Sequence, residues 1–205
     1  MAFVAFTGTV IGLYATSNGQ ESRNHADFAW FEMTPGAVPE PMALSPRPTP
    51  TPLPASDHWR VRAGGYEWRD KEGAEWCSDV GYNTGETAQI FRPINGASEP
   101  ELYQMERYGK DFTYSLPVLP GEYQVKLRFA ETYVKKEGER VFDVFINGKK
   151  VLAHFDILKE AKAFDTAVDK SFPGIHPDAE GMIQIQFISS VQNAKVCAIE
   201  ITRQR

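Results

Sequence analysis

Three tyrosines stand where strand-like segments give way to turns, and they are the side chains of this sequence best placed to do chemistry. Tyr133 follows the alternating segment 125–129. Tyr108 precedes a glycine at the end of another strand-like run, and Tyr82 lies among turn residues. A ring face can cover the apolar face of a pyranose, while amides and carboxylates bond its hydroxyls. Glu131 is the nearest such acceptor, so the pattern predicts a sugar platform.

The alternative for any one of these tyrosines is simple packing at the rim of the core. Tyr123 illustrates it, because it alternates with Val125 and is therefore expected to be buried. Packing accounts less well for three tyrosines that all stand at loop mouths, and their coincidence favours binding.

Catalytic signals are weaker. Glu131 and Asp143 are the one candidate pair for acid and base catalysis. Asp143 lies within an alternating strand and Glu131 ends another, so structural roles are the better interpretation. There is no GxSxG motif, phosphate loop or paired CxxC.

No cofactor is expected. A structural Ca²⁺ in a loop stays open, but no Asp-rich loop requires one. The histidines are scattered without the spacing of metal ligands, at His25, His58, His154 and His176.

Composition excludes several classes of partner. The chain has 205 residues and a net charge of −5, which gives no electrostatic reason to expect nucleic acid or an anionic membrane. No apolar run approaches the ~20 residues of a membrane span, and the apolar start lacks the basic segment of a signal peptide. Cys77 and Cys197 are too few for a disulfide framework. Cys197 is expected to be a buried free thiol, although pairing of the two stays open.

The chain divides at residues 34–57, which are dominated by Pro, Thr, Ser and Ala. Prolines hold such a segment extended, and it cannot bury enough apolar surface to offset its ordering entropy, so we expect a semi-rigid linker. Residues 1–33 are typical of two strands, which are too little structure to be stable alone. The chain is therefore expected to begin inside a larger protein, with residues 58–205 as its complete domain.

The second half of this domain is a succession of short strand patterns. Pro120-Gly121 separates two of them, and Asn147-Gly148 between two more is the strongest short hairpin signal. Residues 181–190 alternate apolar side chains with glutamine, and no amphipathic helix of four turns appears. These patterns predict an all-β fold, an antiparallel sandwich or jelly roll. The Gly-rich and aromatic-rich segment 61–87 is expected to form loops around short strands.

The N-terminal strands carry a resemblance. The stretch "FTGTVIGLYATSNG" followed by "ADFAWFEM" resembles the last two strands of the concanavalin-like β-sandwich that closes many bacterial family 43 glycoside hydrolases. The resemblance implies an upstream catalytic domain in the same polypeptide.

The domain carries a second, longer resemblance. It contains, in order, "VRAGG", "WCSDVGY", "LYQMERYG", "YSLPVLPGEYQVKLRFAETY", "RVFDVFINGKKVLAHFDI" and "NAKVCAIEI". This succession resembles the malectin domain, a β-sandwich lectin whose bacterial relatives form carbohydrate-binding module family 57. The resemblance covers nearly all of residues 60–203 and implies a non-catalytic module that binds glucose oligomers in loops at one end of the sandwich. Its tyrosine in "ERY" falls on Tyr108, and its tyrosine after "FAE" falls on Tyr133.

Three positions depart from the family pattern. A second aromatic beside the last tyrosine is Val134 here, and the tyrosine of an "SDY" triplet is Val80, with Tyr82 as its expected substitute. The family's aspartate before the last strand falls on Gln192, next to Asn193. The resemblance therefore implies sugar binding without carrying over malectin's preference for an α-linked glucose disaccharide.

Together these features predict a module that binds glucose-type or plant-polysaccharide oligosaccharides weakly and directs an attached glycoside hydrolase to its substrate. Secretion by a bacterium follows only indirectly, from the substrate class and the linker. One alternative is a malectin-like spacer or protein-interaction domain without sugar binding, which Val134 and Gln192 favour. The other is an enzyme acting within this chain.

Overall fold

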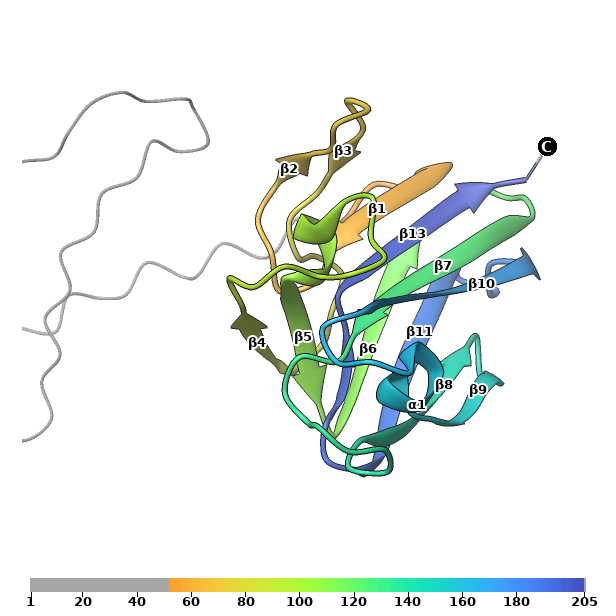
Figure 1. Ribbon diagram of the computed structural model, residues 1–205. Coiled ribbons are helices and arrows are strands. Elements are labelled where there is room, and N and C mark those ends of the chain that lie inside the picture. Colours follow the sequence, from red (N-terminus) through yellow and green to blue (C-terminus); the bar gives the residue numbers. More distant parts are fainter. Residues whose placement is uncertain (1–51, 205) are drawn as a thin grey trace, which may run out of the picture. The chain divides into compact units, whose positions relative to one another are not determined.

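The computed structural model describes residues 52–204. The segment 1–51, with both predicted N-terminal strands, most of the predicted linker and His25, lies outside the described residues, as does Arg205. In the described part, two four-stranded antiparallel sheets pack into a β-sandwich (Figure 1). The predicted all-β antiparallel sandwich is thereby confirmed.

The strands of residues 52–204 form four sheets. The first sheet contains, in order, β1 (His58–Arg62), β13 (Ala198–Arg203), β7 (Tyr123–Ala130) and β10 (Ala167–Ile175). The second contains β6 (Asp111–Pro117), β11 (Met182–Val191), β8 (Val141–Ile146) and β9 (Lys149–Phe155). The third contains β12 (Ala194–Val196), β5 (Met105–Gly109) and β4 (Glu86–Gln89), while β2 (Trp68–Arg69) pairs with β3 (Glu75–Trp76). The helical segments in the described part are η1 (Pro100–Tyr103) and α1 (Ile157–Ala161), and neither could cross a membrane.

Strict alternation places the core between the two larger sheets. Val125, Leu127 and Phe129 of β7 are fully buried, while the lysine and arginine between them face outward. Ile183 and Phe187 of β11 close the core from the second sheet. Successive side chains of a strand point to opposite faces, so each strand supplies one apolar face.

The predicted turns lie where the sequence places them. Asn147 and Gly148 join β8 to β9 with φ of 47° and 75°. Positive φ at both central positions is the signature of a two-residue hairpin turn. Pro120-Gly121 lies between β6 and β7.

The third sheet depends on one close approach of the backbone. Gly64 has φ of 70°, and a Cβ there would lie 2.3 Å from the carbonyl oxygen of Glu106 in β5. Only glycine permits this contact. The loop after β1 is thereby held against β5, the strand that carries Glu106 and Tyr108.

The last residues of the predicted linker contact the domain. Leu53 packs against the main core, and the backbone N–H of Ser56 donates to the carbonyl of Pro117 at 3.2 Å. The predicted domain boundaries otherwise stay predictions.

Both thiols are free, as predicted for Cys197, which is fully buried, and Cys77 is partly buried. Burial raises the pKa of Cys197 to about 12 and that of Cys77 to about 11. Because the thiolate is the reactive form, we expect the native protein at pH 8 to react with Ellman's reagent slower than an ordinary thiol by roughly two orders of magnitude. The rate should rise with pH, and unfolding in guanidinium without reductant should release both thiols. Recovery of none would reveal a disulfide instead.

Candidate functional site

A pocket of about 490 Å³ brings together four of the six residues that the sequence singled out. Tyr108 comes from β5, Tyr133 from the loop after β7, and Gln192 and Asn193 from the turn between β11 and β12. The remaining lining residues are Ala88, Gln89, Ile90, Arg92, Glu106, Thr132 and Arg140. Segments far apart in sequence therefore build one concave site, and it combines two aromatic rings with amide and charged groups.

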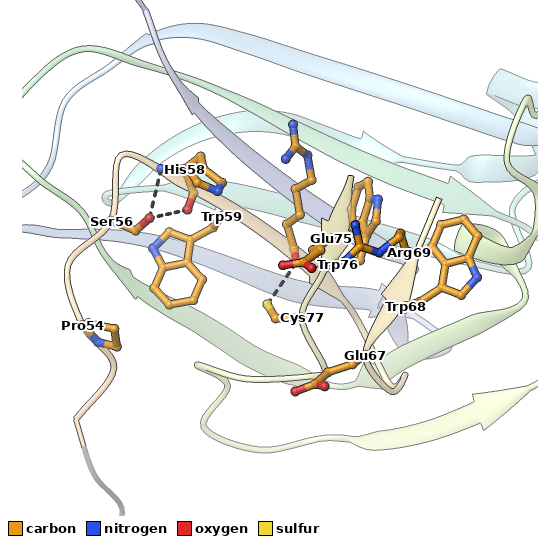
Figure 2. Close-up of a pocket in the computed structure, with 11 residues that line it drawn as sticks. Pro54, Ser56, His58, Trp59, Glu67, Trp68, Arg69, Glu75, Trp76 and Cys77 are labelled. Atoms are coloured by element: carbon orange, nitrogen blue, oxygen red, sulfur yellow. Dashed lines mark hydrogen bonds and ion pairs between the residues drawn. The ribbon is translucent and has the colours of Figure 1, made fainter. Parts of the chain in front are cut away.

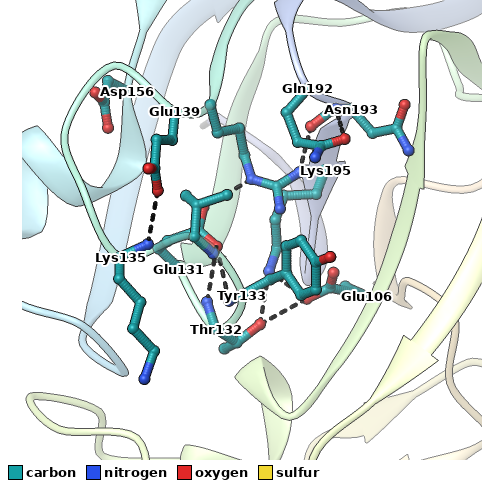
Figure 3. Close-up of polar contacts among 12 residues, drawn as sticks. Glu106, Glu131, Thr132, Tyr133, Lys135, Glu139, Asp156, Gln192, Asn193 and Lys195 are labelled. Atoms are coloured by element: carbon teal, nitrogen blue, oxygen red, sulfur yellow. Dashed lines mark hydrogen bonds and ion pairs between the residues drawn. The ribbon is translucent and has the colours of Figure 1, made fainter.

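Glu131 lies beneath the pocket and does not line it. Its side chain is fully buried, and Oε1 accepts hydrogen bonds from the backbone N–H groups of Thr132, Tyr133 and Val134 at 2.9–3.1 Å. Oε2 accepts from Nε of Arg140 at 2.7 Å (Figure 3). Both oxygens are thus occupied within the protein. The expected role of Glu131 as an acceptor of sugar hydroxyls does not fit this placement, and its carboxylate instead fixes the loop that presents Tyr133.

A second buried ion pair lies beside the first. Nζ of Lys195 is fully buried and pairs with Oε2 of Glu106. The hydroxyl of Thr132 links the pair to the Tyr133 loop, because it donates to Glu106 at 3.1 Å and accepts from Lys195 at 3.0 Å. The pocket floor is consequently a connected polar network in which each charge has an opposite partner.

The turn of Gln192 and Asn193 is held in an uncommon backbone conformation. Gln192 has φ of 57°, a region that non-glycine residues rarely adopt and that persists only when neighbours enforce it. Its carbonyl accepts from Nζ of Lys110 at 2.9 Å, and the carbonyl of Asn193 accepts from Nη1 of Arg140. Arg140 therefore connects both walls of the pocket through one side chain.

The two tyrosines offer rings at the surface. Tyr133 is 71% exposed although its backbone is firmly held. The hydroxyl of Tyr108 donates to Oε2 of Glu86 at 2.9 Å, and this hydrogen bond raises the pKa of the phenol above its ordinary value. Tyr108 therefore stays neutral at physiological pH, and the hydrogen bond from its hydroxyl to Glu86 orients its ring.

Tyr82 lies on the other face of the third sheet. Glu106 and Tyr108 line the pocket, whereas Arg107 between them points away from it. Its guanidinium lies 3.3 Å from the ring centroid of Tyr82 and donates to Asp79 at 2.6 Å. Asp79 and Arg107 form a buried ion pair. Burial lowers the pKa of Arg107, but the hydrogen bond and charge of Asp79 outweigh it and leave this pKa above its ordinary value. Tyr82, the expected substitute for the family tyrosine, therefore does not line this pocket.

The two carboxylates weighed as an acid and base pair have separate partners. Glu131 pairs with Arg140, whereas Asp143 pairs with Lys150 and accepts from the backbone N–H of His154 at 2.7 Å. Across residues 52–204 no group of three or more His, Cys, Asp or Glu side chains is placed to hold a metal ion.

Four of the residues that shape the site gave no sequence signal: Arg92, Glu106, Arg140 and Lys195. Charged residues are nearly always exposed, so a sequence pattern assigns them to the surface. The one available hint is that Lys195 directly precedes an apolar strand, on a segment with no other charge until Glu200.

A second hollow, of about 610 Å³, lies between the segment before β1 and the β2–β3 hairpin (Figure 2). Trp59, Trp68 and Trp76 line it, yet Nε1 of Trp59 already donates to Pro117 at 2.8 Å. Sγ of Cys77 donates to the carbonyl of Arg60 at 2.9 Å. These polar groups are satisfied by the protein, and none of the predicted site residues lies there.

Comparison with known proteins identifies the family of the domain. The Malectin domain family matches residues 58–199, and the chain belongs to this family of carbohydrate-binding domains. Malectin of Homo sapiens is 34% identical over 173 residues, which cover 73% of this chain and 57% of the human protein. The chain thus spans little more than half the length of that relative. Residues 2–34 separately match the family described as Beta xylosidase C-terminal Concanavalin A-like domain.

Solved structures share the fold. A Bacteroides uniformis beta-glucuronidase superposes with a TM-score of 0.63 at 22% identity, over 72% of this chain and 18% of that one. The ANX2 ectodomain from Arabidopsis thaliana superposes with a TM-score of 0.62 at 21% identity, over 70% of this chain and 48% of that one. At these identities the likeness shows the sandwich and nothing of its ligands.

Replacing Glu131 with Gln should destabilise the domain by about 3–5 kcal/mol, because it leaves the buried guanidinium of Arg140 without its counter-charge. Urea unfolding followed by tryptophan fluorescence measures the change. The matched control is Glu160→Gln, which removes a partly exposed pair with Lys170 and should cost at most about 1 kcal/mol. Equal costs for the two variants would contradict the structural role of Glu131.

Proposed function

We propose that this domain is a non-catalytic module that binds a neutral oligosaccharide in the pocket between Tyr108 and Tyr133. The observation that carries the proposal is that the exposed ring of Tyr133 and the partly exposed ring of Tyr108 line one concave site together with Gln192 and Asn193. Rings cover the apolar faces of sugars, and amides both donate to and accept from hydroxyls. The position of both tyrosines in the family pattern supports the same assignment.

The charge balance of the pocket favours a neutral ligand. Arg92 donates to both carboxylate oxygens of Asp165 at 2.9 and 3.0 Å. Arg140 and Glu106, the other charged lining residues, pair with buried partners of their own. An acidic sugar would find no unpaired cation among these groups, whereas a neutral sugar can bond the polar atoms that remain.

The expected affinity is weak. Two rings covering roughly 100 Å² of sugar surface contribute about 2.5 kcal/mol, and each net hydrogen bond adds about 1 kcal/mol. Association costs of several kcal/mol offset much of this sum. A dissociation constant between roughly 10 μM and 1 mM results.

Weak binding suits a module tethered to an enzyme. Tethering converts binding of the substrate polymer into an intramolecular event with a high effective concentration. We propose that the domain directs an upstream glycoside hydrolase to a plant polysaccharide outside a bacterial cell. The match of residues 2–34 to a concanavalin-like domain of a beta xylosidase and the proline-rich segment 34–57 support this arrangement.

A second candidate function is a spacer or protein-contact domain without sugar binding. Position 134 favours it, because the second aromatic of the family site is here a valine that is buried and offers no ring to a ligand.

Replacing Tyr133 with Ala in the 205-residue chain should weaken sugar binding by roughly tenfold, since one ring face accounts for about half of the apolar contact. Calorimetric titration against maltose, nigerose, cellobiose, xylobiose and arabinobiose measures this, with Tyr108→Ala expected to act alike. Leu119→Ala is the control, because Leu119 precedes β7 and so lies at the opposite end of this strand from Tyr133. If the wild-type chain binds none of these sugars at millimolar concentration, the result would favour the spacer function.

Affinity for the bound sugar should change less than about twofold between about 50 and 500 mM NaCl, because a neutral ligand in a charge-paired pocket leaves little interaction for salt to screen. The same titration repeated in both buffers checks this. Tighter binding of a uronic-acid oligosaccharide, lost at high salt, would show that Arg92 or Arg140 is available to an anion.

A further inference from the structure

Phe91 is the most exposed large apolar side chain in the described part of the chain, at 86%. Burying a phenylalanine is worth about 1.5–3 kcal/mol, so an exposed ring forgoes stabilisation that the core could have provided. Its neighbours Ile90 and Arg92 both line the pocket. Phe91 does not itself line the pocket, but its backbone lies between two residues that do.

The backbone that carries Phe91 is fixed on both sides. The N–H of Ile90 donates to the carbonyl of Gln104 at 2.8 Å, and Nε2 of Gln104 donates to the carbonyl of Arg92 at 2.9 Å. One residue of the neighbouring segment thus holds both flanks of Phe91. A ring on such a backbone has less motion to lose on binding than a ring on a free loop.

A single hydrogen bond joins the segments that carry the two exposed rings. Nη2 of Arg92 donates to the carbonyl of Thr132 at 2.9 Å. Phe91 directly precedes Arg92, and Tyr133 directly follows Thr132. Phe91, 86% exposed, and Tyr133, 71% exposed, therefore each adjoin one partner of this hydrogen bond.

We propose that Phe91 is a second stacking platform beside the pocket, so that the domain binds oligosaccharides longer than a disaccharide more tightly than the disaccharide itself. The inference rests on the proposed function, since it assigns a further sugar unit to the same ligand. Tyr133 and Tyr108 hold the units inside the pocket, and Phe91 holds the unit that extends past the rim. The ring adds affinity only for a ligand long enough to reach it.

The test is a chain-length series with the 205-residue chain. Xylobiose and xylohexaose, and maltose and maltohexaose, are titrated into the wild type and Phe91→Ala by calorimetry. A ring face of roughly 50 Å² corresponds to roughly tenfold in affinity. We expect this gain from dimer to hexamer in the wild type and its loss in Phe91→Ala, with dimer affinity unchanged within about twofold.

Two further variants separate stacking from folding. Phe91→Trp keeps a platform and should keep the gain, and Leu119→Ala removes an exposed apolar side chain away from the pocket and should also keep it. Thermal unfolding verifies that every variant is folded.

The outcomes are distinct. No gain with length in the wild type, or a gain that survives Phe91→Ala, overturns the role of Phe91, while loss of dimer binding in Tyr133→Ala still supports the proposed function. Equal weakening of dimer and hexamer in Phe91→Ala also overturns it, because the ring would then contact the first units. Absence of any binding by the wild type overturns both proposals together.

Discussion

A buried carboxylate, that of Glu131, sets the geometry on which the site depends. One oxygen holds three consecutive backbone N–H groups at the end of β7, and the other holds the guanidinium of Arg140. Arg140 in turn holds the Gln192–Asn193 turn. A single ionised side chain therefore fixes two walls of the pocket, whose segments lie about sixty residues apart in the sequence.

Such a network is poor evidence for stability and better evidence for specificity. Removing two charges from water costs several kcal/mol per ion, which the mutual attraction of a buried pair offsets only when the geometry is good. Here two pairs, Glu131 with Arg140 and Glu106 with Lys195, are joined through Thr132. A mobile loop loses conformational entropy when a ligand binds. Because these ion pairs already fix the loops, the entropic cost of binding a ligand is lower.

The sandwich supplies a rigid frame and the loops supply the chemistry. Strands β7 and β11 contribute apolar side chains to the core along their length. Tyr133 and Gln192 lie in the loops that follow these strands. The sheet of β4 and β5 adds Tyr108 and the segment that carries Phe91. Under the proposed function, a charge-paired site of this kind would give modest affinity for one sugar unit, and tethering to an enzyme would raise the effective concentration.

The sequence by itself determined the fold class and pointed to four side chains that line the candidate pocket. Alternation over 125–129, the Asn147-Gly148 turn and the resemblance of residues 60–203 to the malectin domain led to the sandwich, to Tyr108 and Tyr133, and to Gln192 and Asn193. Local patterns suffice there, because strand periodicity and turn chemistry depend on neighbours in the chain. The burial of Glu131, the placement of Tyr82 on the opposite face of β5 and the roles of Arg140 and Lys195 were decided only by the tertiary structure. A buried charge is stable only beside its partner, and these partners come from distant parts of the chain.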